Sequence, residues 1–278
     1  MNSSSASPAV IITAGRGSLL GGLRELWDSR ELLGFLAWRD IRVRYSQTLI
    51  GVAWALLEPL IGVLIFTLIF HRVAGFEPTS APYPLYCLSA LIVWSFFGRA
   101  MRDISVSFVA NATLLRKIYF PRLVLPLAVV GASLVDFGCA AVMYLGMLVA
   151  YGVAPTWTLA LLPVWLALAG VVVLGVGLAL AALNVWFRDV TQALPFLIQV
   201  WMFATPVVYP LDAIPSKWQA IYRLNPMVGV IEGARWSLLP DYAFDPSLLI
   251  STVVVGAALL ALGLFGYQRA ERGLADVI

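Results

Sequence analysis

The sequence predicts an all-α polytopic membrane protein with six transmembrane helices, an N-terminal amphipathic interfacial helix and short periplasmic helices before the last span. Three observations support this fold class. The 278 residues are 61% hydrophobic and 12% charged, with a mean hydropathy of +0.91, whereas soluble domains carry about 25% charged residues. Uncharged stretches of about 20 residues, the length that crosses a bilayer, recur along the chain. The alternating segments of roughly ten residues that build a membrane β-barrel do not occur.

Six stretches are long and apolar enough to span a membrane. Glu58 interrupts the first, and Asp136 is the one charge between Arg122 and Arg188, a stretch that holds the third and fourth. Gly152 and the proline that follows at 155 separate these two spans, because both residues break helices. The predicted spans are residues 49–70, 85–110, 123–151, 157–186, 190–211 and 246–268.

The basic residues predict how the chain is oriented in the membrane. Most of the 18 lysines and arginines fall in the segments that share a side with the two termini, such as 16–44 and 99–122. Cytoplasmic segments of membrane proteins carry this excess of positive charge. We therefore expect a multi-pass protein with both termini in the cytoplasm.

The N-terminal segment is predicted to be flexible over residues 1–18 and to form one cytoplasmic amphipathic helix over 19–44. Apolar residues recur there at helical spacing, as in a helix that lies in the headgroup region with its tryptophans at the interface. The pattern is imperfect, because Arg30 falls on the apolar stripe and Trp38 falls off it. A soluble helix packed against a partner is the alternative. The stripe comprises Leu19, Leu23, Leu26, Trp27, Leu33, Ala37 and Ile41.

The outer segment before the last span is predicted to hold two short periplasmic helices within residues 215–240. The stretch "LNPMVGVIEGARWSLL" (224–239) offers Asn225 as an N-cap and Pro226 at the first helical position. The stretch "PSKWQAIYRL" (215–224) precedes it. Both helices are too short and too charged to span, so we expect them to dip into the outer leaflet or to cover a pore mouth.

The residues for enzymatic chemistry are missing, and we expect no catalytic residue, metal site or cofactor in this chain. His71 is the single histidine, and the two cysteines, Cys87 and Cys139, lie in apolar stretches, so a zinc site with three or four ligands cannot form. No phosphate-binding loop of the form G-x-x-x-x-G-K-[ST] occurs. Nucleic-acid binding is not expected either, because the basic residues flank lipid spans and build no basic domain.

Glu58 stands inside the first span, directly before Pro59. A charge at this depth costs several kcal/mol, so such carboxylates usually face a cavity or a partner group. Three interpretations remain open. Glu58 lines a hydrated path, carries a proton alone or with Asp136, or stays neutral and satisfies carbonyls freed by the proline.

Three stretches together resemble one family of membrane proteins. They read "RDIRVRYSQTLIGVAWALLEPL" (39–60), "NATLLRKIYFPRLVLPLA" (111–128) and "LNVWFRDVTQALPFLIQVWMFATPVVYP" (183–210), the last followed by "RLNPMVGVIEGAR" (223–235). The resemblance is to the membrane subunits of bacterial ABC exporters for polysaccharides, the Wzm- and TagG-like permeases of O-antigen and teichoic acid export. It covers the chain from about Arg39 onward.

The resemblance implies a homodimer in the bacterial inner membrane that binds two copies of a cytosolic ABC ATPase. The partner subunit would bind ATP and magnesium, which agrees with the missing phosphate-binding loop. The implied substrate is a polysaccharide on a polyprenyl diphosphate, O-antigen-like, with teichoic acid or capsule as alternatives. A proton-coupled secondary transporter that uses Glu58 and Asp136 is a rival interpretation, as is a membrane enzyme acting on lipid-linked sugars.

The segment 111–120 resembles the coupling helix of the family, which docks into a groove of the ATPase. Its alternative role is to hold headgroup phosphates through its cations and thereby to fix the topology. The predicted contact residues are Asn111, Leu114, Leu115, Arg116 and Lys117.

Two further sets of residues are predicted to contact the substrate. Arg44 and Tyr45, just before the first span, would form a cytoplasmic gate where the diphosphate enters, because arginine matches phosphate oxygens; simple topology fixing is the alternative for Arg44. Aromatic rings that stack on sugars would line the channel, although Trp201 and Phe203, two residues apart, cannot both face it. The predicted channel residues are Trp54, Glu58, Trp94, Phe97, Trp201, Phe203 and Tyr209.

Overall fold

The computed structural model describes residues 19–46, 51–78, 81–118 and 120–277. Within these ranges every regular element is a helix, so the predicted all-α class is confirmed. The predicted flexible segment 1–18 lies outside the described residues. The helices are α1 (Leu19–Asp28), α2 (Arg30–Tyr45), α3 (Trp54–Phe66), α4 (Tyr83–Ala110), α5 (Ala112–Lys117), α6 (Val124–Ala150), α7 (Leu162–Trp186), α8 (Asp189–Phe203), α9 (Ser216–Arg223), α10 (Pro226–Leu238) and α11 (Ser247–Val277). Shorter 3-10 or π turns are η1 (Gly51–Ala53), η2 (Thr67–Val73), η3 (Trp157–Leu161) and η4 (Leu211–Ala213).

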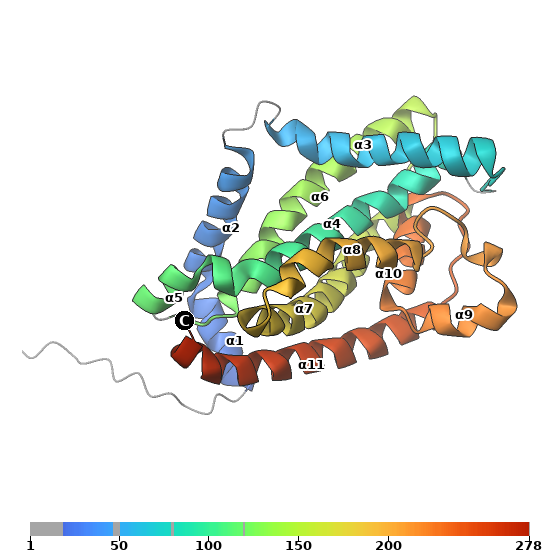
Figure 1. Ribbon diagram of the computed structural model, residues 1–278. Helices are drawn as coiled ribbons and strands as arrows, with labels where there is room; N and C mark the ends of the chain where they lie inside the picture. Colours follow the sequence, from blue (N-terminus) through green and yellow to red (C-terminus); the bar gives the residue numbers. More distant parts are fainter. Residues whose placement is uncertain (1–18, 47–50, 79–80, 119, 278) are drawn as a thin grey trace, which may run out of the picture.

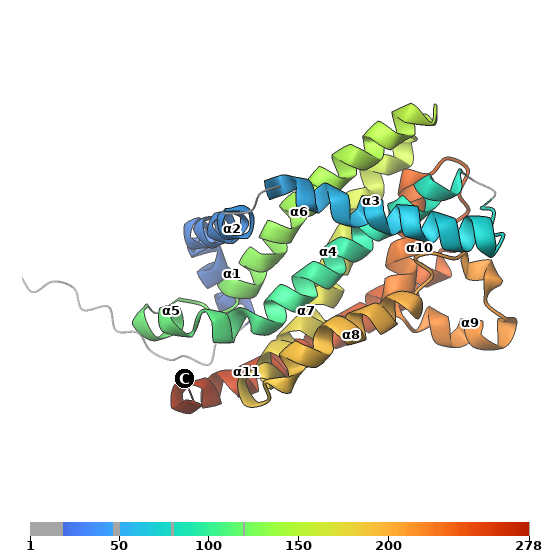
Figure 2. The same cartoon turned by 45° about the horizontal axis from the view of Figure 1, so that its top comes forward.

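Five helical segments of the described chain are long and apolar enough to cross a membrane. They correspond to the first four predicted spans and to the last, and they cover Trp54–Val73, Tyr83–Ala110, Val124–Ala150, Trp157–Trp186 and Ser247–Ala270. In Figures 1 and 2 they form one bundle, with α5 and the chain end at one extremity and α9 and α10 at the other. We call the first extremity, which carries Arg116, Lys117 and Arg188, the basic end.

The predicted span 190–211 differs from the helix that forms there. Helix α8 has 15 residues and ends at Phe203, because Pro206 disfavours helical geometry at the preceding residue and has no N–H of its own. The freed polar groups are bound locally: the Thr205 hydroxyl donates to the Trp201 carbonyl at 2.9 Å. Asn225 donates to the Thr205 hydroxyl oxygen at 2.9 Å and also accepts the Met227 N–H as the predicted N-cap of α10. The end of α8 and the start of α10 are thus joined by one side chain.

Helix α4 is the central helix of the bundle. In the most apolar window of each helix, 83% of the α4 residues are buried, against 17% for the first span and 22% for α11. It packs against α3, α6, α7, α8 and α10, and Figure 2 shows it between α3, α6 and α8. Three charged contacts of α4 are accordingly made inside the protein, from Arg99 to Glu58 and Asp136 and from Asp103 to Arg44.

The predicted helix 19–44 is two helices, α1 and α2, which meet at Ser29. Figure 1 shows α2 running crosswise to the bundle at its basic end, where it packs on α6. Leu36, which the predicted stripe did not include, is fully buried among apolar residues of α4, α6, α7 and α11. Phe35 and Trp38 face outward, 65% and 63% exposed. Helix α2 thus packs one face on the bundle and turns a second, apolar face away from it.

Helices α7 and α11 touch backbone to backbone at Gly175 and Gly263. A Cβ atom at Gly263 would lie 2.0 Å from the Gly175 carbonyl oxygen, whereas a Cβ at Gly266, one turn further along α11, would meet no atom within 4 Å. Close helix contacts of this kind require small residues.

We expect Gly263→Ala to destabilise the protein by about 1–3 kcal/mol, because the methyl group forces the two helices apart. Gly266→Ala, the matched control, should leave stability unchanged or raise it by roughly 0.5–1 kcal/mol through helix propensity. Thermal unfolding of the two variants in the same detergent measures both effects. Equal melting temperatures would contradict the close contact.

Candidate functional site

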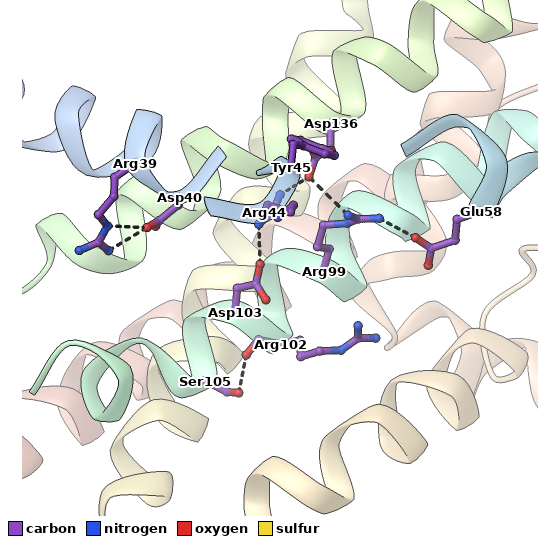
Figure 3. A network of polar contacts seen from close by, with 10 residues as sticks. All are labelled: Arg39, Asp40, Arg44, Tyr45, Glu58, Arg99, Arg102, Asp103, Ser105 and Asp136. Atoms are coloured by element: carbon purple, nitrogen blue, oxygen red, sulfur yellow. Dashed lines mark hydrogen bonds and ion pairs between the residues drawn. The ribbon is translucent and has the colours of Figure 1, made fainter. Parts of the chain in front are cut away.

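A network of arginine and carboxylate side chains connects four helices near the basic end (Figure 3). Arg44, in the last turn of α2, binds two carboxylates. Its Nη2 atom donates to Oδ2 of Asp103 on α4 at 2.6 Å, and its Nη1 atom donates to Asp136 on α6. The Tyr45 hydroxyl donates to the other Asp136 oxygen. Two consecutive residues of α2 are therefore fixed to the same carboxylate.

Tyr45 contributes a protonated phenol to this contact. Burial of Tyr45, followed by its hydrogen bond to Asp136 and the charge of that carboxylate, raises the pKa of the phenol to about 12. Tyr45 is thus protonated at neutral pH and acts as a donor. Asp136, whose side chain is 8% exposed, receives bonds from both residues, as a buried carboxylate requires.

Arg99 extends the network from α4 to α3. Its Nη2 atom donates to Oε2 of Glu58 at 2.5 Å, and its Nη1 atom lies 3.7 Å from Oδ2 of Asp136. The partner of Glu58 in the structure is therefore a guanidinium. The role of Glu58 in transport stays a prediction.

A polar groove opens beside Glu58, between α3, α4 and α8. Its volume is about 320 Å³. Helices α4 and α8 approach closely at its base, since a Cβ at Gly98 would lie 3.1 Å from Cγ2 of Ile198. The lining residues are Glu58, Pro59, Gly62, Leu91, Trp94, Ser95, Gly98, Arg99, Arg102, Pro195, Ile198, Gln199 and Met202.

The predicted channel residues lie in several places rather than in one. Trp94 and Glu58 line the groove. Phe97 is fully buried, with its ring edge-on to Trp201 at 5.1 Å, so it supports the groove wall from behind and does not reach its surface. The Trp201 indole N–H donates to Asn225 at 3.0 Å, which ties it to the start of α10.

The remaining predicted aromatic residues lie further from the groove lining. Trp54 and Phe203 are about half exposed on α3 and α8. Tyr209 lies at the α9–α10 end, where its hydroxyl donates to the Phe203 carbonyl at 2.7 Å and lies 3.2 Å from the Tyr222 hydroxyl. There it lines a second pocket of about 490 Å³ together with Phe70, Phe76, Ala213, Ile214, Pro215, Trp218 and Tyr222.

The predicted coupling residues occupy α5 and its boundaries. Asn111 separates α4 from α5 and donates to the Ser107 carbonyl at 2.8 Å. Leu114 and Leu115 pack in part against the apolar cluster around Leu36, and Arg116 and Lys117 are exposed. The exposed apolar residue of this segment is instead Ile118, directly after α5, which is 55% exposed and which the sequence interpretation did not single out.

The gate residues are engaged within the chain. Both Nη atoms of Arg44 face carboxylates, and its side chain is 19% exposed. The predicted contact of Arg44 and Tyr45 with a substrate diphosphate stays a prediction, and it would require both side chains to leave Asp136.

A second buried ion pair, at the α9–α10 end, was missed from the sequence. Arg235 of α10 is fully buried and donates to Oε1 of Glu232, one turn earlier, at 2.9 Å. Its Nη2 atom donates to the Val207 carbonyl at 2.6 Å, and its guanidinium lies 3.9 Å from the Tyr86 ring centre. Tyr242 donates to the other Glu232 oxygen at 2.7 Å. The i, i+3 spacing of the pair was the only signal in the sequence.

This cluster fixes the turn that follows α8. Arg235 holds the carbonyl of Val207, and the Tyr83 hydroxyl holds that of Val208 at 2.7 Å. Burial and the charge of Glu232 raise the pKa of Tyr242, so the phenol keeps its proton and donates. The turn is thus bound to α4 and α10 by charged and aromatic side chains.

Comparison with known proteins identifies the family. A sequence model of the ABC-2 type transporter family matches residues 31–239. The chain belongs to the ABC-2 type transporter family. The match includes the ionic network, the groove and the buried pair on α10, and it ends just before α11. The resemblance found in the sequence is thereby confirmed.

Several curated relatives align with this ABC-2 chain over nearly its full length. The O-antigen export system permease protein RfbA of Myxococcus xanthus is 31% identical over 253 residues, which are 90% of this chain and 96% of the relative. The polysialic acid transport protein KpsM of Escherichia coli is 26% identical over 240 residues, 85% and 92% of the two chains. The capsule polysaccharide export protein CtrC of Neisseria meningitidis is 24% identical over 260 residues, 91% and 96%.

Proposed function

We propose that this ABC-2 chain is the membrane-spanning permease subunit of an ATP-driven exporter, which moves a lipid-linked polysaccharide from the cytoplasm to the periplasm. One observation carries the proposal: the relatives that align with 85–91% of the chain are, by name, permeases, transport proteins or export proteins for O-antigen, polysialic acid and capsule polysaccharide. The M. xanthus O-antigen permease has the higher identity, which favours an O-antigen-like glycan over capsule. A polyprenyl diphosphate is the proposed carrier.

The proposed topology has six crossings and both termini in the cytoplasm. Helix α8 and the bound turn after it would make the fifth crossing, although the helix itself has only 15 residues. The distribution of basic residues supports a cytoplasmic basic end. The outward faces of α1 and α2, with Phe35 and Trp38, fit the membrane interface, and α9 and α10 would lie on the periplasmic side.

The proposed assembly is a homodimer with two ATPase subunits, which bind ATP and magnesium. The groove supports the dimer, because its charged lining is too polar to face lipid while the first span beside it is only 17% buried. A second copy of the chain that covers α3 and α8 would enclose these charges.

Purified alone, the chain should hydrolyse no ATP, because it contains no phosphate-binding loop. Hydrolysis should require the ATPase subunit expressed with it. ATP turnover by a rigorously pure sample of this chain would contradict the proposed division of labour.

We expect Ile118→Asp to release the ATPase subunit. An exposed apolar residue at the centre of a docking contact contributes about 2 kcal/mol or more, which corresponds to roughly 30-fold weaker association. The matched control is Ile221→Asp, since Ile221 of α9 is 57% exposed against 55% for Ile118 and lies at the opposite end. Co-purification with a tagged ATPase measures the effect, and equal recovery with both variants would exclude α5 as the docking helix.

A further inference from the structure

The groove contains one arginine whose guanidinium contacts no carboxylate. Arg102 lies one turn after Arg99 on α4 and lines the groove between α3, α4 and α8. Arg99 and Arg44 each face two carboxylates. Among the described residues, the guanidinium of Arg102 has neither an ion pair nor a hydrogen bond, and only its backbone carbonyl accepts one, from Ser105.

An aspartate follows Arg102, but its carboxylate is bound to Arg44. Adjacent side chains leave a helix about 100° apart, and they pair only when they bend toward each other, as Arg39 and Asp40 of α2 do. Asp103 faces α2, whereas Arg102 lines the groove. Figure 3 shows the Arg102 side chain extending away from Asp103 and from the rest of the network.

The rest of the lining suits an anion that is attached to a polar, ring-bearing group. Glu58, the one carboxylate among the lining residues, is already bound to Arg99 at 2.5 Å. The Gln199 amide and the Ser95 hydroxyl add donors from α8 and α4, and Trp94 adds an aromatic ring. A guanidinium binds phosphate oxygens in a forked, charge-assisted geometry.

The size of the groove limits what it can hold. A volume of about 320 Å³ is at the lower end of the roughly 300–1,000 Å³ typical of ligand pockets. It is sufficient for a phosphate or diphosphate and the first adjoining ring, but not for a long glycan.

We propose that the groove between α3, α4 and α8 binds the diphosphate of the lipid-linked substrate, and that Arg102 is its phosphate contact. This inference rests on the proposed function and names the part of the substrate that the chain recognises. It assigns the contact to Arg102 rather than to Arg44, whose guanidinium is occupied by Asp103 and Asp136.

The test uses the complex of this chain and its ATPase in nanodiscs of phosphatidylcholine, with tritiated farnesyl diphosphate as the probe. Arg102→Gln should weaken binding about tenfold or more, because a charge-assisted hydrogen bond is lost. Arg102→Lys, which keeps the charge but loses the fork, should recover part of the affinity. The matched control is Arg42→Gln, an exposed arginine of α2 at the same end, which should bind the probe as the wild type does.

Three results would overturn the assignment. The first is unchanged probe binding by Arg102→Gln. This variant should fold normally, because the guanidinium has no partner to lose. The second is an equal loss with Arg42→Gln, which would indicate a general charge effect. The third is displacement of the probe by phosphatidylglycerol at the same concentration as by unlabelled farnesyl diphosphate, which would make the groove a headgroup site.

The same samples separate this inference from the proposed function. If the wild-type complex exports polysaccharide with ATP and the Arg102→Gln complex exports and binds equally well, the inference alone fails. If the wild-type complex exports no polysaccharide, the proposed function fails, whatever the probe binding shows.

Discussion

Arg235→Met is expected to be the most destabilising single substitution in this chain. Arg235 is fully buried and paired with Glu232, whose side chain is 6% exposed. Removing one partner of a buried pair leaves an uncompensated charge and costs about 3–5 kcal/mol. The Val207 carbonyl also loses its donor, so the turn after α8 should loosen. Unfolding by heat or denaturant, with the protein in detergent, measures the loss of stability.

The control for this prediction lies at the same end of the molecule. Arg223 pairs with Asp245 at 2.9 Å, but the two side chains are 45% and 43% exposed, and exposed pairs contribute at most about 1 kcal/mol. Arg223→Met should therefore have a small effect. The double variant Arg235→Met with Glu232→Gln should regain part of the lost stability, because no unpaired charge remains. Equal effects of the two arginine substitutions would contradict the buried pair.

Asp136→Asn is expected to have the second largest effect, and it should impair export as well as stability. Asp136 receives bonds from Arg44 and Tyr45 and lies 3.7 Å from Arg99. Arg44 and Arg99 keep Asp103 and Glu58 as partners, but the charge-assisted bonds from Arg44 and Tyr45 to Asp136 are weakened, at a cost of roughly 3 kcal/mol. Helix α2 loses its main polar attachment to α6, so the basic end should open.

A double-mutant cycle tests this interpretation. Asp136→Asn and Arg44→Gln should be strongly non-additive, with a coupling of roughly 1–3 kcal/mol, because they remove the two sides of one contact. Asp40→Asn, which affects the more exposed pair of Asp40 with Arg39, should change stability by less than about 1 kcal/mol. Additive effects of the Asp136 and Arg44 substitutions would show that the two side chains do not interact.

Local patterns in the sequence predicted most of the helices. Hydropathy found the helices around α3, α4, α6, α7 and α11 because a membrane span is a property of consecutive residues. The cap at Asn225 was found because a helix cap, too, is defined by a few consecutive residues. The end of α8 at Phe203 was not found, although Pro206 marks it, because the surrounding apolar run reads as one span. The break at Ser29 between α1 and α2 was also missed.

The partners of the charged residues could not be predicted from the sequence. Arg44 and Asp136 are 92 positions apart, and only the packing of α2 on α6 brings them together. Glu58 and Asp136 were recognised as unusual, but Arg99 and Asp103 looked like ordinary flanking charges, although the helix that carries them is central. Arg235 looked like an exposed cation of a short periplasmic helix, because neither its burial nor its contact with the ring of Tyr86 can be seen in the neighbouring sequence. Arg102 could not be told from Arg44 and Arg99 as a phosphate contact in the sequence, because only the structure shows that those two arginines are paired with carboxylates.

Arg99 and Glu58 belong to the ionic network and also line the groove, so the two sites are adjacent. Arg99 lies between Asp136, which holds α2, and Glu58 on α3. Helix α2 is followed by the first span and packs in the same apolar cluster as Leu114 and Leu115 of α5.

Reconstituted transport is the most direct test of the proposed function. Proteoliposomes that contain this chain and its ATPase, with a lipid-linked polysaccharide in the bilayer, should move the glycan across the membrane only when ATP and magnesium are supplied on the ATPase side. Vesicles with the ATPase alone, or with this chain alone, should move none. Movement of the glycan without ATP, driven by a proton gradient, or equal movement without this chain, would contradict its role as the permease of an ATP-driven polysaccharide exporter.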